Sequence, residues 1–417
     1  MLSRLAVIIR GLLLAAAVGL PLTAGAASVE NVRLGQHGER TRIVLDISEP
    51  VDFQVFSLAD PYRIVVDLPE MAWNASSASF QVRAGAISGL RFGLFKPGNS
   101  RLVLDASSPV LVDKAFLLAP NDGGGHRFVI DLVPTDRESF LASLRPPASA
   151  PAETPSAQAA AATASPPAPI PVAAPAVPMP GSKPKHAKDA RRVVVLDPGH
   201  GGVDPGTVAL SGRFEKHLVL SYALEVRRQL QARGGYTVIM TRETDVFLPL
   251  RERVRIAHEA AADLFISIHA DSIADRGIRG GAVYTLSEKG SDAEADALAA
   301  RENKSDLIAG VSLDKHDEEV VSILIELAQR ETMNYSVRFA NGLVPQLLRH
   351  QVPLRANPHR FGAFAVLKAP DVPSVLVELG YLTNKTDERF LLSDQARGAV
   401  ARAIAAAVDK YFADLES

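Results

Sequence analysis

The chain has 417 residues, which is long for a single domain, so we expect two folded units joined by a linker. Its 45 Lys and Arg residues nearly balance its 47 Asp and Glu residues, and the formal net charge of -2 gives no electrostatic reason to expect a nucleic-acid partner. There is no cysteine, which excludes disulfides, thiol nucleophiles and cysteine metal ligands, so any metal site must use His and carboxylate side chains.

The first residues have the order of a secretory signal. Two arginines precede an apolar run over residues 12–18, and small residues follow around 24–27. This order predicts a signal peptide over residues 1–27, cleaved near Ala26 or Ala27, and a mature protein outside the cytoplasm. The arginines are not adjacent, which disfavours a twin-arginine signal. An uncleaved anchor is the alternative, but glycines and a proline shorten the apolar run below the ~20 residues of a spanning helix.

Residues 28–134 contain one pattern four times, at spacings of 21, 38 and 26 residues. Each copy has an Arg and an Asp four positions apart, which lie on one face of a strand, with aliphatic or aromatic residues between them. This pattern predicts a small all-β domain, most simply a sandwich, that acts as a targeting or binding module. The Arg and Asp side chains form either cross-strand salt links on a solvated face or a ligand site. The copies are Arg42–Asp46, Arg63–Asp67, Arg101–Asp105 and Arg127–Asp131.

Residues 135–190 form the predicted linker, which from about Arg145 is mainly Pro, Ala and Ser. Such a segment buries too little apolar surface to offset its ordering entropy. Its prolines favour extended polyproline II, so roughly 45 residues reach on the order of 100 Å.

Residues 191–417 form the second predicted unit, in which apolar strands alternate with amphipathic helices. This alternation predicts an α/β fold with a central, mainly parallel sheet covered by helices, phosphorylase/hydrolase-like in class. We expect strands over 193–196, 236–241, 264–268, 363–367 and 374–377, and helices over 215–233, 250–262, 319–349 (one or two helices) and from about 393.

Three of these strands end in residues that can carry chemistry, namely His200, His269 and Glu378. If the strands are parallel neighbours, these side chains meet beyond the carboxyl ends of the sheet, where open α/β sheets bind ligands. Glu215 begins a helix after a glycine-rich loop and can fold back onto His200. Two His and one Glu around an open position are the ligand set of a catalytic zinc site. Glu378 can then take a proton from the metal-activated water and pass it to the leaving amine. His217 is a rival ligand, but we favour a place on the helix surface.

These residues resemble the N-acetylmuramoyl-L-alanine amidases of the Amidase_3 type, over essentially all of 191–417. The resemblance implies one zinc ion bound by His200, Glu215 and His269, with Glu378 catalytic. The matching motifs are Asp197-Pro-Gly-His200-Gly-Gly-x-Asp204-Pro-Gly, Glu215-Lys216, Thr241-Arg242-x-x-Asp245, Leu250-x-x-Arg253, Ser267-Ile-His269-Ala-Asp271 and Val377-Glu378-Leu-Gly380-Tyr-Leu-Thr-Asn384.

The N-terminal unit is similar to the AMIN domain of periplasmic cell-division amidases. This resemblance implies peptidoglycan binding, recruitment to the division septum and a monomeric enzyme. It also implies the substrate, the amide between the lactyl group of N-acetylmuramic acid and L-alanine of the stem peptide.

A long insertion separates His269 from Glu378 and contains a predicted helix over residues 291–307, followed by an acidic stretch at 314–319. Related septal amidases place an inhibitory helix here, so the resemblance implies that a glutamate occupies the open zinc position until a partner with a LytM-type domain displaces it. Glu302 is our candidate and Glu294 is the rival. Alternatively, these charges form the solvated face of an amphipathic helix.

Two other functions remain open from the residues. A zinc peptidase that cuts within stem peptides would use the same metal chemistry, and a non-catalytic envelope-binding protein could recruit division factors. The four-residue constellation argues against the second.

Overall fold

The computed structural model describes residues 27–76, 83–120, 125–144, 191–310 and 323–416. The predicted signal peptide apart from its last residue, most of the predicted linker and the acidic stretch at 314–319 lie outside the described residues. Among the described helices, none is both long and apolar enough to cross a membrane.

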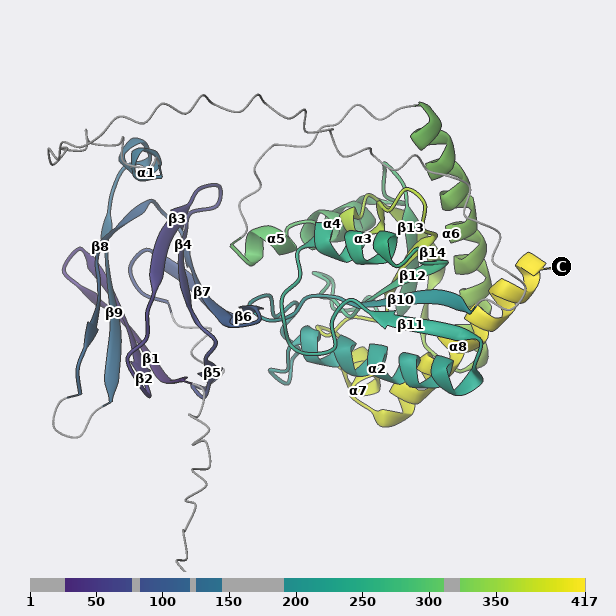
Figure 1. Ribbon diagram of the computed structural model, residues 1–417, viewed down its shortest axis with the longest axis horizontal. Coiled ribbons are helices and arrows are strands. Elements are labelled where there is room, and N and C mark those ends of the chain that lie inside the picture. Colours follow the sequence, from purple (N-terminus) through teal and green to yellow (C-terminus); the bar gives the residue numbers. More distant parts are fainter. Residues whose placement is uncertain (1–26, 77–82, 121–124, 145–190, 311–322, 417) are drawn as a thin grey trace, which may run out of the picture.

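The N-terminal unit consists of two sheets packed face to face, antiparallel apart from the short parallel pair of β1 and β5 (Figure 1). The sheets share one apolar core, to which Ile43, Ile64, Leu102 and Ile130 contribute. The predicted all-β sandwich is therefore confirmed. One sheet has the order β5-β1-β2-β9-β8 and the other the order β3-β4-β7-β6. The strands are β1 Ser28–His37, β2 Arg40–Ile47, β3 Gln54–Leu58, β4 Arg63–Pro69, β5 Ala72–Trp73, β6 Ile87–Lys96, β7 Asn99–Ala106, β8 Val110–Leu118 and β9 His126–Pro134.

The repeated Arg and Asp residues form cross-strand ion pairs. Arg42 on β2 pairs with Asp131 on β9 at 2.6 Å, and Arg101 on β7 pairs with Asp67 on β4 at the same distance. The expectation of a solvated face is wrong for the four-stranded sheet, because Val103, which neighbours Arg101 on its outer face, is fully buried. The second unit, residues 191–417, covers that face.

Helix α1 (Arg137–Ser143) begins the segment predicted as linker. Asp136 caps its first turn, since the carboxylate accepts a hydrogen bond from the Ser139 amide. Phe140 is fully buried and packs edge-on against Tyr62. The ordered N-terminal unit thus extends several residues past the predicted boundary at 134.

The second unit is an α/β layer structure around a six-stranded sheet with the order β11-β10-β12-β15-β13-β14. All neighbouring strands are parallel except β13 and β15, so the predicted mainly parallel sheet is confirmed. The strands are β10 Arg192–Pro198, β11 Tyr236–Met240, β12 Leu264–His269, β13 Gly281–Leu286, β14 Leu354–Gly362 and β15 Ser374–Glu378.

Helices cover both faces of this sheet because its strands are apolar on both sides (Figure 1). Val194 on β10 faces the core formed with α2, α6 and α8, while Val195 faces α3, α4 and the turn η2. The helices are α2 Glu215–Arg233, α3 Leu250–Glu259, α4 Ala293–Glu302, α5 Ser305–Ile308, α6 Ile323–Arg349, α7 Lys385–Leu391 and α8 Asp394–Glu416, and η2 spans Ala365–Leu367.

Two local predictions need correction. The expected strand over 363–367 is the 3-10 turn η2, and the strand of this region, β14, comes earlier. The expected helix over 291–307 is two helices, α4 and α5, separated at Asn303 and Lys304. Asn303 stabilises the break because its amide contacts the backbone of Ala363 and Ala365 on the neighbouring loop.

Candidate metal centre

The strand ends bring three of the predicted site residues together. Strand β12 lies between β10 and β15, and His269 stands opposite Glu378 in the register of β12 and β15. His200 follows β10 by two residues. Glu215 is the first residue of α2 and is fully buried. The side chains predicted from sequence thus meet at the carboxyl edge of the parallel strands.

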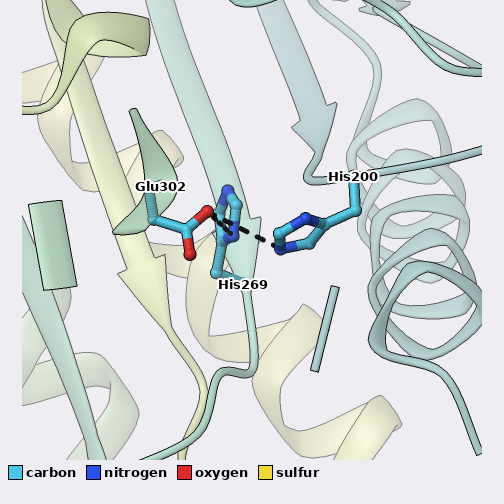
Figure 2. Close-up of side chains that lie close together, drawn as sticks. All are labelled: His200, His269 and Glu302. Atoms are coloured by element: carbon cyan, nitrogen blue, oxygen red, sulfur yellow. Dashed lines mark ion pairs between the residues drawn. The ribbon is translucent and has the colours of Figure 1, made fainter. Parts of the chain in front are cut away.

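Two carboxylate oxygens lie close to the facing nitrogens of His200 and His269. Nε2 of His200 lies 3.2 Å from Oε1 of Glu215 and 3.6 Å from Oε2 of Glu302. Nδ1 of His269 lies 3.5 Å and 3.1 Å from the same two oxygens. A tetrahedral ion with ligand bonds near 2.05 Å has ligand atoms about 3.3 Å apart, so each of the four His–carboxylate separations is compatible with a metal ion bound between the two His rings. Figure 2 shows Glu302 directed at both His rings, and this trio has its ligand atoms within 4.8 Å of one another.

The electrostatics of the cluster favour a cation. Burial opposes protonation of His200, but the carboxylates of Glu215, Asp204 and Glu302 outweigh it and raise its pKa well above the usual value. For His269 the same balance, with Glu302 and Glu215 against burial, raises the pKa to about 10. Nε2 of His200 and Nδ1 of His269 are buried and lack a hydrogen-bond partner among the described residues. A metal ion would satisfy both nitrogens and neutralise the carboxylates.

The Asp204 carboxylate orients the His200 ring through the nitrogen that faces away from the cluster. Its Oδ2 lies 2.9 Å from Nδ1 of His200, which leaves Nε2 of that ring free to face the cluster. The other oxygen, Oδ1, accepts a hydrogen bond from the Gly206 amide. Asp204 belongs to the sequence motif of His200, and its position four residues after that candidate ligand is the signal from which its supporting role could have been predicted.

Arg253 on α3 fixes the loop that carries His200. His200 has a φ of +59°, in the left-handed region that is unfavourable for a side chain of its size. The Arg253 guanidinium donates to the His200 carbonyl at 2.7 Å and to Asp197 Oδ1 at 2.7 Å, and it is 1% exposed. Burial alone would raise the pKa of Asp197, but the Arg253 charge together with the hydroxyls of Thr241 and Ser267 lowers it. An ionised, paired Asp197 therefore anchors the loop.

Glu378 is buried beside the cluster. Its Oε1 accepts a hydrogen bond from the Asp271 amide at 2.8 Å, and its Oε2 has no partner among the described residues. Burial, followed by the negative charges of Asp271 and Glu215, raises its pKa well above the usual value. A carboxyl group in this state can exchange a proton with a nearby reacting atom.

Helix α4 carries Glu302 into the site. The buried residues Ala295, Leu298 and Ala299 form its apolar stripe, and Glu302 is the next position along it. Glu302 is 6% exposed, so the reading of its charge as part of a solvated helix face is wrong. The rival, Glu294, faces Arg355 and Tyr381 instead.

Two further ion pairs hold the helix on the sheet, Arg301 with Asp271 and Arg360 with Asp292. His217, the other rival ligand, is exposed and lies 4.0 Å from Asp245.

A cavity of about 730 Å³ opens beside the cluster. The N-terminal unit lines it with Arg63 and Arg91, and the catalytic unit lines it with His200, Arg301 and Glu302. An α/β sheet with a convergent His and carboxylate cluster at its carboxyl edge and an adjoining cavity defines a hydrolase whose site can take a metal ion.

Comparison with known proteins gives the family. Residues 194–410 match the N-acetylmuramoyl-L-alanine amidase family, and residues 31–132 match the AMIN domain. The amidase AmiC of Escherichia coli O6:H1 is 34% identical over 397 residues, which cover 94% of this chain and 91% of that protein. AmiC of Neisseria meningitidis serogroup B is 33% identical over 89% of this chain and 86% of that protein. AmiA of Escherichia coli K12 is 42% identical over 55% of this chain and 80% of that protein.

Solved structures similar to the chain include the amidase AmiC2 of Nostoc punctiforme, with 26% identity and a TM-score of 0.40 over 53% of this chain and 97% of that one. The catalytic domain of CwlV from Bacillus (Paenibacillus) polymyxa has 26% identity and a TM-score of 0.38 over 53% and 98%.

The chain belongs to the N-acetylmuramoyl-L-alanine amidase family and carries an AMIN domain. The predicted enzyme class, a hydrolase that acts as an amidase on peptidoglycan, is confirmed.

Proposed function

We propose that the enzyme uses zinc to cleave the amide between N-acetylmuramic acid and L-alanine, and that an inserted helix restrains it. The observation that carries this proposal is the convergence of His200, Glu215, His269 and Glu378 at the carboxyl edge of β10, β12 and β15.

Product analysis tests the bond that is cut. Digestion of purified peptidoglycan should release stem peptides with a free L-alanine amino group and glycan strands with an unmodified lactyl carboxylate. Fragments cut between stem-peptide residues would instead favour a zinc peptidase and contradict the proposal.

His200, Glu215 and His269 are the proposed protein ligands of the metal. The chemistry of this set suits zinc, because two imidazoles and one carboxylate leave a position for water or substrate. Glu215 is held in place by two backbone amides, those of Ala270 and Thr207, at 2.8 and 2.9 Å. When bound, zinc supplies a Lewis acid for the scissile carbonyl and lowers the pKa of a water molecule.

Glu378 is the proposed general base. Its unpartnered Oε2 supports this role, because a carboxylate oxygen with no other contact is available to take the proton of the attacking water. The raised pKa then favours holding that proton until the leaving amine of L-alanine takes it.

Glu302 is the proposed autoinhibitory residue. Its Oε2 lies 3.1 and 3.6 Å from the two His nitrogens, which supports a role as the fourth ligand of a tetrahedral site. A carboxylate there keeps water and substrate away from the metal. Activity then requires α4 to leave the site.

Substitution of Glu302 tests the proposed autoinhibition. Glu302→Ala should raise hydrolysis of peptidoglycan in the absence of any activator by about tenfold to 100-fold, the range for a competent state populated at about 1–10%. Glu288→Ala is the matched control, since it removes an exposed glutamate just before α4 and should change nothing. Equal basal rates for Glu302→Ala and the native enzyme would contradict autoinhibition.

The cellular setting follows from the same family. We propose a periplasmic enzyme, exported by the N-terminal signal sequence and recruited to the division septum through its AMIN domain. It acts there as a monomer to separate daughter cells. A protein with a LytM-type domain is the proposed activator that displaces α4. Localisation of a fluorescent fusion to the septum in dividing cells, lost on deletion of residues 28–134, would support this setting, and uniform distribution would contradict it.

A further inference from the structure

The outer face of the four-stranded sheet of the N-terminal unit lies against the segment that follows Glu302. On β4 and β7 the side chains alternate, so Ile64 and Leu102 enter the sandwich core while Val65 and Val103 point outward. The two valines are fully buried and pack with Ala309, which follows α5, in a separate apolar cluster. Neither valine would be buried if this face met solvent.

Three arginines on this face bind the end of α5. The last carbonyls of a helix have no partner within it, so donors beyond the helix can bind them. Arg63 donates to the Leu307 carbonyl and Arg91 to the Ile308 carbonyl. Arg101 donates to the Gly310 carbonyl at 3.1 Å and to the Ala309 carbonyl at 3.4 Å. Four successive carbonyls are thereby held by the N-terminal unit. Among the four carbonyls, that of Leu307 also accepts a bond from the Gly310 amide at 3.1 Å.

Two of these arginines, Arg91 and Arg101, are held by ion pairs within the N-terminal unit. The Arg101 guanidinium makes two bonds to Asp67, at 2.6 and 2.8 Å, and stacks 3.6 Å above the centre of the Phe95 ring. Arg91 is paired with Asp105 in the same way. A donor that is pre-positioned by an ion pair loses little side-chain entropy on binding, which makes this face a specific receptor for backbone carbonyls.

The same unit also meets two loops of the second unit, the one after β11 and the one that carries His200. In the loop after β11, the Phe247 amide donates to the Leu94 carbonyl at 3.1 Å, and Phe95 and Phe247 stack with centroids 6.0 Å apart. A Cβ atom on Gly93 would lie 2.2 Å from the Gly202 carbonyl carbon, so the two backbones approach as closely as glycine allows. The N-terminal unit thus contacts both the loop that carries His200 and the segment that follows Glu302.

We infer that the outer face of β4, β6 and β7 is the docking surface for residues 307–310 of the same chain, and that this docking holds Glu302 in the metal site. The inference rests on the proposed inhibitory role of Glu302. It gives the N-terminal unit a regulatory part beyond targeting, because α4 can leave the site only after α5 has left this face.

Arg101→Ala tests the inference in the full-length enzyme. The variant loses the contacts to Ala309 and Gly310 and should raise the basal rate of peptidoglycan hydrolysis several-fold. Arg42→Ala is the matched control, because Arg42 makes the same kind of cross-strand pair with Asp131 on the other sheet, away from α5, and should leave the basal rate unchanged. The double variant Glu302→Ala with Arg101→Ala should hydrolyse no faster than Glu302→Ala alone, since both act on one restraint.

The outcomes distinguish a failure of the proposed docking surface from a failure of autoinhibition by Glu302. If Glu302→Ala raises the basal rate and Arg101→Ala does not, autoinhibition by Glu302 is supported and the proposed docking surface is contradicted. If Glu302→Ala has no effect, autoinhibition by Glu302 is contradicted. If Arg42→Ala raises the rate as much as Arg101→Ala, the effect comes from general loosening of the domain and the docking surface is again wrong.

A covalent rescue gives a second test of the docking surface. The native chain has no cysteine, and a Cβ atom at Gly310 would lie 3.1 Å from a methyl group of Val65, a separation that a disulfide can span. Because Gly310 has a φ of +72°, a cysteine there is strained in both redox states, so the oxidised variant is compared with the same variant reduced. In Arg101→Ala, adding Val65→Cys and Gly310→Cys and oxidising the pair should return the basal rate to the native level, and reduction should raise it again. Arg101→Ala without the cysteines, treated identically, corrects for effects of the redox reagents. A disulfide that forms without lowering the rate would overturn the inference.

Discussion

Oδ2 of Asp204 lies 2.9 Å from Nδ1 of His200, and the same oxygen accepts a hydrogen bond from the Ser305 hydroxyl at 2.5 Å. One carboxylate therefore orients a proposed metal ligand and also holds the first residue of α5. The metal site and the inhibitory segment share a side chain, so a change at Asp204 acts on both.

Asp204→Asn should weaken zinc binding by about 10-fold to 100-fold, the usual effect of removing a partner behind a His ligand. Competition with a chromophoric chelator measures this affinity. Asp275→Asn, on an exposed loop after β12, should leave it unchanged. The same zinc affinity for Asp204→Asn and native enzyme would show that His200 needs no such support.

Glu378→Gln should retain zinc and lose about 10²-fold to 10⁴-fold in kcat, because the amide keeps the size of the side chain but takes no proton. Metal content and the rate of peptidoglycan hydrolysis are measured on the same preparation, in a Glu302→Ala background so that the site is open. If the double variant hydrolysed peptidoglycan as fast as Glu302→Ala alone, Glu378 would not be the general base.

Arg355→Ala should raise the basal rate, but less than Glu302→Ala does. Arg355 on β14 binds Glu294 at the start of α4 and also contacts Tyr381, so its loss frees one end of the helix while Glu302 remains. Arg349→Ala, which removes a cation at the end of α6, serves as the control. A basal rate for Arg355→Ala no higher than that of the control would mean that this pair does not hold the helix.

Arg253→Ala should lower the free energy of unfolding by about 3–5 kcal/mol, because it leaves the buried charge of Asp197 without its partner. Arg255→Ala on the same helix removes an exposed arginine that pairs with Glu252 and Glu259, and should change the free energy of unfolding little, because solvent screens exposed ion pairs. Urea unfolding followed by circular dichroism compares the two variants. Similar losses for both would contradict the anchoring role of Arg253.

Much of the fold could be predicted from sequence because its signals are local. Continuous apolar runs identified β10, β12 and β15, and the polar residue at each strand end identified the candidate site. The pattern of α4 also contained the position of Glu302, since a glutamate that continues an apolar stripe must be buried or displaced.

Other features depend on contacts between distant segments. The apolar residues at 363–367 were expected to form a strand, but they form η2, where Val366 and Leu367 pack under α3 and α4. The pairing of Ser305 with Asp204 and of Arg101 with Gly310 joins residues about 100 and 200 positions apart. No periodicity or motif in either segment indicates its partner.

The most direct measurement is the anomalous scattering of zinc in crystals of the full-length enzyme. The account predicts one zinc ion within about 2.2 Å of Nε2 of His200, Nδ1 of His269 and one oxygen each of Glu215 and Glu302. Zinc bound elsewhere, or bound at this site with water in place of Glu302 while the enzyme is inactive, would contradict it.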